Sequence, residues 1–455
     1  MSRIWLFCLS SIFVLSLSAS AQRRIVPPVV LISIDGLKPD YVLEADRHKL
    51  KIPNLRRFVK EGAFASAVNG VTPTVTYPSH TTLVTGVSPA KHGIYANTPF
   101  DPFSKNQGGW YWYAEDIRVP TLWDVCAKAG LKTASVDWPV TVGAKIDFNI
   151  VQMWRAATPD DRKLIRALST PGLLTEAENS IGNYPEGYDY TVEADVRRAA
   201  FNVYLLEKKR PAFLTTYFAG LDEVQHAHGP DSPAAYAALE TIDALVGQVR
   251  AAAEKLGNGK AVIAVASDHG FSPLNKSLNL NAAFREAGLI EVEAGKVKSW
   301  RAITWNSGGS AAVMLNDKND EDARVKIRQI LRRLAADPES GLFKWYESGI
   351  AEKLEGFPDA AFIVGSRPGT YIGGSVDLPV IRNLKPSGGH GFLAELKEMD
   401  SSFFLVGAGV SAGKNLGRID MRDIAPTLAN LLGVKLPMAE GRNLLNPTPS
   451  SAKAK

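Results

Sequence analysis

Three short, nearly continuous apolar runs constrain the fold of this chain more than any other feature of its sequence. The runs are Val29 to Ile34, Phe213 to Phe218 and Ala261 to Ala266. Apolar runs of this length without polar alternation are typical of strands that are buried on both faces of a parallel sheet. An acidic side chain follows each run within a few residues, namely Asp35, Asp222 and Asp268. The sequence therefore predicts a buried sheet with carboxylates gathered at one edge.

Helical patterns separate these runs and decide the fold class. They cover Thr82 to Gly86, Thr121 to Ala129, Val192 to Lys208 and Pro233 to Leu256. Strands that alternate with helices form a mostly parallel sheet with helices on both of its faces. Such sheets bind ligands beyond the carboxyl ends of their strands, where His269 also falls. The predicted fold class is α/β, with a smaller inserted α+β lobe.

The order of these patterns also divides the chain into units. The predicted units are a signal peptide over 1–21, a core over 22–274 and 386–447, an inserted lobe over 275–385 and a loose tail over 448–455. The lobe is predicted because its segment carries a helical pattern of its own, Glu321 to Ala335, and the strand-like runs Ser310 to Leu315 and Ala361 to Val364.

The N-terminal segment has the pattern of an export signal. Arg3 precedes an apolar run from Ile4 to Leu17, and the small residues Ala19 to Ala21 resemble a cleavage site. The run is shorter than the roughly 20 residues that a membrane-spanning helix needs, although an uncleaved N-terminal anchor is the alternative. Because Cys8 lies in this segment, Cys126 alone would remain, and one cysteine forms no internal disulfide. We expect a periplasmic or secreted protein without a membrane span in its mature part.

The charge balance argues against one class of partner. The formal net charge is +5, from 52 basic and 47 acidic residues that are dispersed along the chain. Nucleic-acid-binding domains concentrate basic residues on one face or along one helix. No nucleic-acid-binding surface is evident in this sequence.

Carboxylates and imidazoles recur at spacings that suit metal ions. Asp222 and His226 are four residues apart, which places both on one face of a helical turn. Asp268 and His269 are adjacent at the end of a predicted strand, and His390 stands in a glycine-rich stretch that lets it approach a crowded site. Each pattern alone fits a cap, a turn or a surface pair. Together they predict a metal site.

Several motifs, in this order and at this wide spacing, resemble the nucleotide pyrophosphatase/phosphodiesterase branch of the alkaline phosphatase superfamily. They are Ile34-Asp35-Gly36-Leu37, Thr76-Tyr77-Pro78-Ser79-His80-Thr81, His92-Gly93-Ile94, Asp222-x-x-x-His226-x-x-Gly229-Pro230, Ser267-Asp268-His269-Gly270 and His390-Gly391. The resemblance covers almost the whole predicted mature chain. It implies an alkaline-phosphatase-like fold and an exported hydrolase of phosphodiester or phosphoanhydride bonds that acts on phosphate-ester or nucleotide substrates.

The resemblance also implies roles for individual residues. Thr76 matches the nucleophile that forms a covalent intermediate, and Asn97 matches the asparagine that binds a non-bridging phosphate oxygen. Two Zn²⁺ ions are implied as cofactors. The ligands of the first zinc would be Asp35, Thr76, Asp268 and His269, and those of the second would be Asp222, His226 and His390.

Two tyrosines are candidates for substrate binding by the same resemblance. Tyr77 follows the nucleophile, and Tyr217 lies shortly before Asp222, where family members place aromatic residues that sandwich a nucleobase. The alternative is that both tyrosines are packing residues beside the sheet. His228 replaces a usual aromatic residue, and its role stays open.

Two other functions remain as alternatives. A phosphomonoesterase on the same metal pair would need extra positive charge for a dianionic phosphate, and Arg155 is one candidate for that charge. An inactive exported binding protein could keep the fold, although every implied ligand position is intact. The sulfatase pattern C/S-x-P-x-R is not found in the chain.

Overall fold

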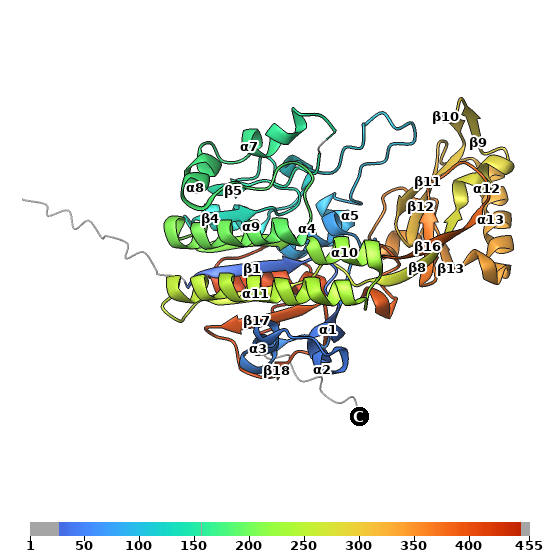
Figure 1. The fold of residues 1–455 in the computed structure, drawn as a ribbon. Coiled ribbons are helices and arrows are strands. Elements are labelled where there is room, and N and C mark those ends of the chain that lie inside the picture. The colour runs from blue at the N-terminus through green and yellow to red at the C-terminus, as the bar shows by residue number, and fades with distance from the viewer. Residues whose placement is uncertain (1–26, 156, 447–455) are drawn as a thin grey trace, which may run out of the picture.

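The computed structural model describes residues 27–155 and 157–446, and its centre is an eight-stranded sheet (Figure 1). The predicted signal peptide (1–21) and tail (448–455) lie outside the described residues. The strands of the sheet are β1 (Val29–Ile34), β2 (Ala63–Phe64), β4 (Thr133–Val136), β5 (Phe148–Ile150), β6 (Phe213–Phe218), β7 (Val262–Ala266), β17 (Phe403–Gly407) and β18 (Lys414–Asn415). Their order is β18-β2-β17-β7-β1-β6-β4-β5.

The predicted parallel character of the sheet is confirmed. β1 pairs in parallel with both β6 and β7, and β4 pairs in parallel with β5 and β6. β17 is the exception, because it runs antiparallel to β7 and β2. The three apolar runs of the sequence therefore become three adjacent central strands, which end at the same edge of the sheet.

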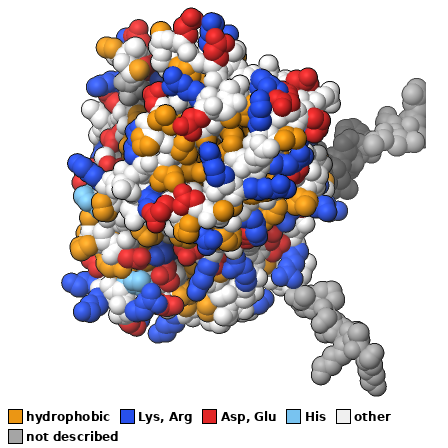
Figure 2. All heavy atoms as spheres, turned by 90° about the vertical axis from the view of Figure 1, so that its right-hand side faces the viewer, with side chains coloured by type: hydrophobic (Ala, Val, Ile, Leu, Met, Phe, Trp, Pro, Cys, Tyr) orange, Lys and Arg blue, Asp and Glu red, His pale blue; other side chains and the backbone are white. Residues whose placement is uncertain are grey.

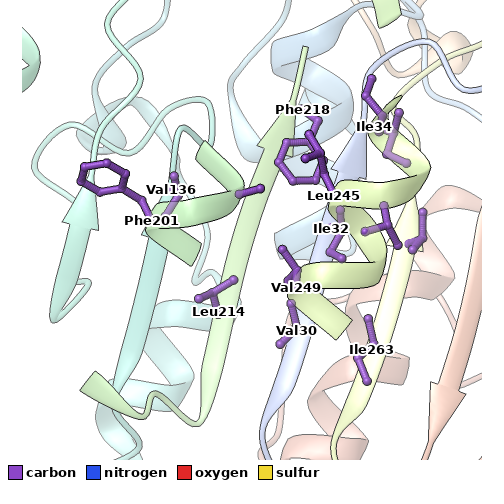
Figure 3. Packing of buried hydrophobic residues seen from close by; sticks show 14 of the residues in the cluster. Val30, Ile32, Ile34, Val136, Phe201, Leu214, Phe218, Leu245, Val249 and Ile263 are labelled. Carbon is purple, nitrogen blue, oxygen red and sulfur yellow. The ribbon is translucent and has the colours of Figure 1, made fainter. Parts of the chain in front are cut away.

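Helices cover both faces of the central sheet, and two more, α12 and α13, belong to the segment between its strands β7 and β17. The α-helices are α1 (Pro39–Leu43), α2 (Ala45–His48), α3 (Pro53–Glu61), α4 (Thr76–Thr85), α5 (Pro89–His92), α6 (Leu122–Lys128), α7 (Leu164–Leu168), α8 (Leu173–Ile181), α9 (Val192–Tyr204), α10 (Gly220–His228), α11 (Pro233–Leu256), α12 (Leu280–Glu286), α13 (Glu321–Ala336) and α14 (Ile424–Leu432). Val30, Ile32 and Ile34 of β1 share an apolar cluster with residues of α3, α9 and α11, and Figure 3 shows Leu245 and Val249 of α11 beside them. Val29 and Leu31 point to the opposite face, where α4, α6 and α14 lie. This alternation follows from the two-residue period of a strand.

Two helices differ from their predicted limits. α4 begins at Thr76 rather than at Thr82, and all of its residues are buried. A helix that is buried on every side has no amphipathic period, so its first turn gives no sequence signal. α9 ends at Tyr204, and the chain continues as a π-helix over Leu205–Lys209.

The segment from Ser272 to Gly389 forms smaller sheets at the right of Figure 1. Their strands are β8 (Ser272–Asn279), β9 (Ile290–Glu293), β10 (Lys296–Trp300), β11 (Ala302–Ser307), β12 (Ser310–Leu315), β13 (Leu342–Glu347), β14 (Phe362–Ser366), β15 (Gly369–Gly373) and β16 (Ile381–Gly389). The antiparallel sheet β11-β12-β14-β13 packs with α12 and α13 around an apolar cluster of its own. We call this segment the lobe, and its predicted limits of 275–385 stay a prediction.

The lobe leaves and rejoins the core through paired strands. β8 begins shortly after His269, β16 ends just before His390, and the two strands are antiparallel with Ser272 opposite Gly389. Because the pairing brings the exit and the return of the lobe together, it also brings these two histidines together. A further small sheet pairs β3 (Ala67–Asn69) with β19 (Arg418–Asp420).

The side chains on the surface of the lobe are of mixed type. On the face of the lobe that Figure 2 shows, acidic and basic side chains are interspersed with apolar ones. Across residues 27–155 and 157–446, no helix combines the length and the apolar character that crossing a membrane requires. Cys126 is buried, and burial raises the pKa of its thiol to about 12, so the thiol is protonated and unreactive at neutral pH.

Candidate metal centre and active site

The first group of candidate ligands lies at the carboxyl ends of β1 and β7. Asp35 directly follows β1, while Asp268 and His269 follow β7. Nε2 of His269 lies 3.2 Å from Oδ1 of Asp35 and 3.2 Å from Oδ2 of Asp268. One ligand atom from each of these residues falls within 4.8 Å of the others, so a single ion could contact all three. The structure thus brings together three of the four residues predicted for the first zinc.

The second group is built around Asp222 on α10. Nε2 of His226 lies 3.3 Å from Oδ2 of Asp222, and Nε2 of His390 lies 3.6 Å from Oδ1 of the same carboxylate. The rings of His390 and His269 stack with their centroids 3.7 Å apart and an angle of 10° between their planes. Asp222, His269 and His390 also offer ligand atoms within 4.8 Å of one another. His269 therefore borders both groups, which the motif spacing did not indicate.

Backbone carbonyls fix the imidazoles of both groups in one tautomer. Nδ1 of His226 is 3.0 Å from the carbonyl of Gly388, and Nδ1 of His269 is 3.1 Å from that of Gly270. His390 is held in the same way by the carbonyl of Thr74, at 3.2 Å. Since a carbonyl only accepts, each Nδ1 carries the hydrogen, and each Nε2 keeps a free lone pair. That is the arrangement of histidines that bind metal ions.

Each first-group carboxylate has one oxygen that the protein holds and one that it leaves free. Oδ1 of Asp268 accepts from the backbone N–H groups of Gly36, at 3.2 Å, and His269, at 3.1 Å. Oδ2 of Asp35 accepts from the hydroxyl of Tyr217. Among the described residues, Oδ1 of Asp35 and Oδ2 of Asp268 have no hydrogen-bond partner, although both are buried.

Burial and mutual repulsion make these free oxygens unfavourable without a cation. Burial raises the pKa of Asp35 well above its usual value, and the nearby charges of Asp222 and Asp268 raise it further. Burial also raises the pKa of Asp222, to about 6. The pKa of His269 is lowered by burial, which keeps its imidazole neutral. A divalent cation removes both costs, and a mixed nitrogen and oxygen donor set fits zinc better than magnesium.

Thr76 is the first residue of α4 and lies beside the first group. Nδ1 of His80 is 2.8 Å from the carbonyl of Thr76 and 3.6 Å from Oδ2 of Asp268. His80 therefore lies between Thr76 and the first group. The N-terminus of a helix carries partial positive charge and favours an anion such as phosphate. Oδ1 of Asn97 accepts from the backbone N–H of Tyr77 at 2.9 Å, which leaves the amide Nδ2 as a donor near the same helix end.

The turn before Thr76 is joined to the stretch that carries His390. The backbone N–H of Gly391 donates to the carbonyl of Thr74 at 3.0 Å, and the hydroxyl of Thr74 donates to the carbonyl of Phe392 at 2.8 Å. These bonds fix the distance between the predicted nucleophile and the second group.

The two tyrosines predicted to sandwich a base do not form an open slot. Tyr77 and Tyr217 are both fully buried. The indole of Trp154 packs against each of them, with ring centroids 6.4 Å and 6.0 Å away, respectively. In this structure both rings pack against Trp154 and the Tyr217 hydroxyl is bound to Asp35, and the predicted stacking of a base between the two tyrosines stays a prediction.

A different tyrosine of the same aromatic group faces solvent. Tyr188 is 42% exposed, and its ring lies 5.2 Å from Trp154 and 4.6 Å from Tyr190. Trp154 also packs against Tyr217, whose hydroxyl donates to Asp35, so Tyr188 belongs to the aromatic group beside the first group of ligands. Tyr184, Tyr188 and Tyr190 lie close together in the sequence, and this concentration of tyrosines is the signal that indicates such a surface.

Two other residues singled out in the sequence belong to neither group of candidate ligands. Nε of Arg155 is 3.0 Å from Oδ1 of Asp161, so its charge is already paired. His228, two residues beyond His226 on α10, is exposed and belongs to neither group of ligands.

Fold and site together define a class: an α/β protein whose parallel sheet ends in a buried cluster of carboxylates and imidazoles suited to divalent metal ions. A family model described as type I phosphodiesterase / nucleotide pyrophosphatase matches residues 29–392. The chain belongs to this family, as the resemblance in its motifs predicted.

Individual relatives match this chain at low sequence identity. The chain is 28% identical over 277 residues to an uncharacterized pyrophosphatase/phosphodiesterase of Schizosaccharomyces pombe, a match that covers 57% of this chain and 50% of the relative. It is 24% identical over 266 residues to the bis(5'-adenosyl)-triphosphatase ENPP4 of Homo sapiens, covering 58% of this chain and 51% of the relative. The chain thus spans about half the length of the curated relatives that it matches.

A solved structure supports the fold. An inactive variant of murine ectonucleotide pyrophosphatase/phosphodiesterase 5, in complex with AMP, superimposes with a TM-score of 0.67 at 21% identity. The match covers 92% of this chain and 98% of that one, which confirms the predicted alkaline-phosphatase-like architecture.

Proposed function

We propose that this chain is an exported, zinc-dependent phosphodiesterase or nucleotide pyrophosphatase with Thr76 as its nucleophile. One observation carries the proposal. His269 and His390 turn free Nε2 atoms toward buried carboxylate oxygens that lack partners among the described residues, next to a threonine at a helix N-terminus. His226 turns its Nε2 toward the other oxygen of Asp222. Membership of the family supports the same reaction.

The two groups of side chains would hold two Zn²⁺ ions. Asp35, Thr76, Asp268 and His269 would bind the first, and Asp222, His226 and His390 the second. Bound in this way, the ions would supply the positive charge that stabilises the attacking and leaving oxygens of an in-line displacement.

The residues of the chain account for the remaining steps. Oγ of Thr76 attacks phosphorus, and the bond from phosphorus to the leaving oxygen breaks, so that the phosphoryl group is carried as an ester of Thr76. The leaving oxygen departs as an alcohol or a phosphate. Water then attacks the same phosphorus, which releases the monoester product and restores the hydroxyl of Thr76. Nδ2 of Asn97 donates to a non-bridging oxygen throughout.

The aromatic group beside the site supports a planar substituent on the substrate. The exposed face of Tyr188 could stack a nucleobase, which contributes roughly 1–3 kcal/mol without specifying the base. The names of the relatives, which include a bis(5'-adenosyl)-triphosphatase, support nucleotide substrates. The phosphomonoesterase alternative gains no support, because the arginine considered for it is paired with Asp161.

Trapping of the covalent intermediate tests the proposal. The zinc-loaded protein is mixed with the 4-nitrophenyl ester of thymidine 5'-monophosphate, quenched in acid and digested for mass spectrometry. We expect a thymidylate adduct on the peptide that contains Thr76, none in Thr76→Ala, and a reduced yield in Thr76→Ser. Thr85→Ala is the matched control, since it removes a hydroxyl from the last turn of the same helix, where the hydroxyl only donates to the carbonyl of Thr81.

Two results would refute the assignment of Thr76 as the nucleophile. One is an adduct on another residue, and the other is a Thr76→Ala variant that keeps a tenth of the wild-type turnover. Export is tested separately by N-terminal sequencing of the protein isolated from its source cells, where cleavage after Ala21 would give Gln22 as the first residue.

A further inference from the structure

A cleft of about 300 Å³ opens between the second group of ligands and the lobe. Its walls include Asn97, His226 and His390 from the core, and Asn306, Ser307 and Tyr371 from the lobe. The candidate active site is thus walled on one side by a part of the chain that supplies none of its predicted ligands.

The lobe wall is held at a fixed distance from His390. The backbone N–H of Gly309 donates to the carbonyl of His390 at 2.9 Å. Gly308 has a φ of +77°, and a Cβ atom at this position would lie 2.1 Å from the same carbonyl oxygen. A side chain at position 308 would therefore push the wall away from the site. The close approach defines where Ser307 stands relative to His390.

The lobe wall offers neutral polar groups. Ser307 is 7% exposed, and within the described part of the chain its hydroxyl has no hydrogen-bond partner. Nδ2 of Asn306 donates to the carbonyl of Ile372 at 2.9 Å, which makes this side chain part of the wall itself. Tyr371 is 37% exposed and presents a phenol. Among the described residues that line the cleft there is neither a lysine nor an arginine.

We propose that this cleft binds the leaving arm of the substrate and selects an uncharged, hydroxyl-bearing group, such as the sugar of a nucleoside, over pyrophosphate. The inference rests on the proposed function. In-line displacement places the leaving group opposite the nucleophile. His226 and His390 of the second group line the cleft beside Val75, which precedes Thr76, and none of the ligands predicted for the first group is among its lining residues. Pyrophosphate is a polyanion that proteins bind with guanidinium or ammonium groups, whereas an unpaired serine hydroxyl and a phenol suit a neutral sugar.

Two probes with the same thymidine 5'-phosphoryl arm separate these leaving groups. The first is dithymidine monophosphate, whose leaving group is a nucleoside, and the second is thymidine 5'-triphosphate, whose leaving group is pyrophosphate. Dissociation constants are measured by calorimetry on the zinc-loaded Thr76→Ala variant, so that the intrinsic reactivity of the two bonds does not enter. Hydrolysis of both probes by the wild-type protein is followed in parallel.

Substitutions in the lobe wall give the decisive comparison. In the Thr76→Ala background, Ser307→Ala should weaken binding of the dinucleotide about fivefold and change that of the triphosphate less than twofold. Tyr371→Arg should tighten binding of the triphosphate at least fivefold and leave the dinucleotide no tighter. Tyr113→Arg is the matched control, because Tyr113 is a 43% exposed tyrosine that does not line this cleft.

The remaining outcomes distinguish a failure of this inference from a failure of the proposed function. Equal weakening of both probes by Ser307→Ala, or no gain for the triphosphate in Tyr371→Arg, would overturn the assignment of the cleft while leaving the proposed function intact. If the wild-type protein hydrolyses neither probe, the proposed function itself fails and this inference fails with it.

Discussion

The hydroxyl of Tyr217 donates a hydrogen bond to Oδ2 of Asp35, and both side chains are fully buried. Tyr217 lies opposite Ser33 in the pairing of β6 with β1, so its ring reaches the side chain that follows β1. The bond leaves Oδ1 as the oxygen of Asp35 that is available to a metal ion. Tyr217 therefore contacts the candidate metal centre through Asp35, and we expect it to act as a positioning residue for that carboxylate.

Removal of this hydroxyl should weaken the first metal site. We expect Tyr217→Phe to lower zinc affinity by roughly 10–100-fold, as is typical for the partner of a metal ligand, and to lower kcat more than it changes KM. Tyr204→Phe is the control, because the hydroxyl of Tyr204 also donates to a carboxylate, that of Glu176 on α8, at 2.8 Å. Equal zinc affinity in the wild type and Tyr217→Phe, measured by competition with a chelator, would contradict the positioning role.

Two histidines on α10 offer a paired test of the second metal site. His226 contacts Asp222, whereas His228 is exposed two residues further on. We expect His226→Gln to lose about one equivalent of zinc and about 100-fold or more in turnover, and His228→Gln to keep both. Metal content by mass spectrometry and turnover of a nitrophenyl diester give the readout. A full zinc complement in His226→Gln would remove this residue from the ligand set.

The exposed tyrosine of the aromatic group should affect substrate choice. Tyr188→Ala is expected to lower kcat/KM for a nucleotide diester by about tenfold, which corresponds to ~1.4 kcal/mol of stacking. It should leave kcat/KM for methyl 4-nitrophenyl phosphate, which lacks a base, within a factor of two. Tyr113→Ala is the control, because Tyr113 is similarly exposed at 43%. Parallel losses on both substrates would argue for a structural role of Tyr188.

A buried charge network beside the site should make stability depend on pH. Nε of Arg198 lies 2.8 Å from Asp137, and its Nη1 donates to Asp195 at 2.9 Å. Asp195 also accepts from the backbone N–H of Gly220 at 2.8 Å, at the start of the helix that carries Asp222. Burial raises the pKa of Asp137 to about 7 and that of Asp195 to about 6, although the guanidinium opposes both shifts.

The sign of the pH effect follows from these raised values. An aspartate in the unfolded chain titrates near 4, so the folded state binds protons more tightly, and the free energy of unfolding falls as the pH rises from about 4 to about 7. The contribution is fully present below about pH 4. In urea unfolding of the metal-free proteins, the free energy of unfolding of the wild type minus that of Asp137→Asn should fall as the pH rises from about 4 to about 7. Asp160→Asn, at an 87% exposed carboxylate, should give a constant difference, and a constant difference for Asp137→Asn would refute the shifted pKa.

The sequence was most informative where burial leaves a clear pattern. The limits of β1 and β6 coincide with the apolar runs, because strands buried on both faces need apolar residues throughout. The acidic residues after these strands gather at one edge, because parallel strands end together. Motif order then identified the family, since chemistry restricts residue types more tightly than packing does.

The parts that the sequence did not predict depend on contacts between distant segments. The role of Tyr217 follows from the register of β6 against β1, which a single sequence does not contain. Trp154 packs beside Tyr77 and Tyr217 through a loop whose path has no periodic signal. In the same way, the pairing of Arg155 with Asp161 depends on local loop geometry rather than on residue type.

The hydrogen bonds between Thr74 and the stretch from His390 to Phe392 have a consequence for the order of events during folding. Nδ1 of His390 and the carbonyl of Thr74 are 316 positions apart along the chain. A chain emerging from a ribosome or a translocation channel therefore presents Asp35 and Thr76 long before the imidazole that completes their surroundings exists. Ligands gathered from such distant positions meet only after the lobe has folded and returned the chain to the core. Under the proposed ligand assignment, completion of the second metal site, which needs His390, thus becomes a late event of maturation.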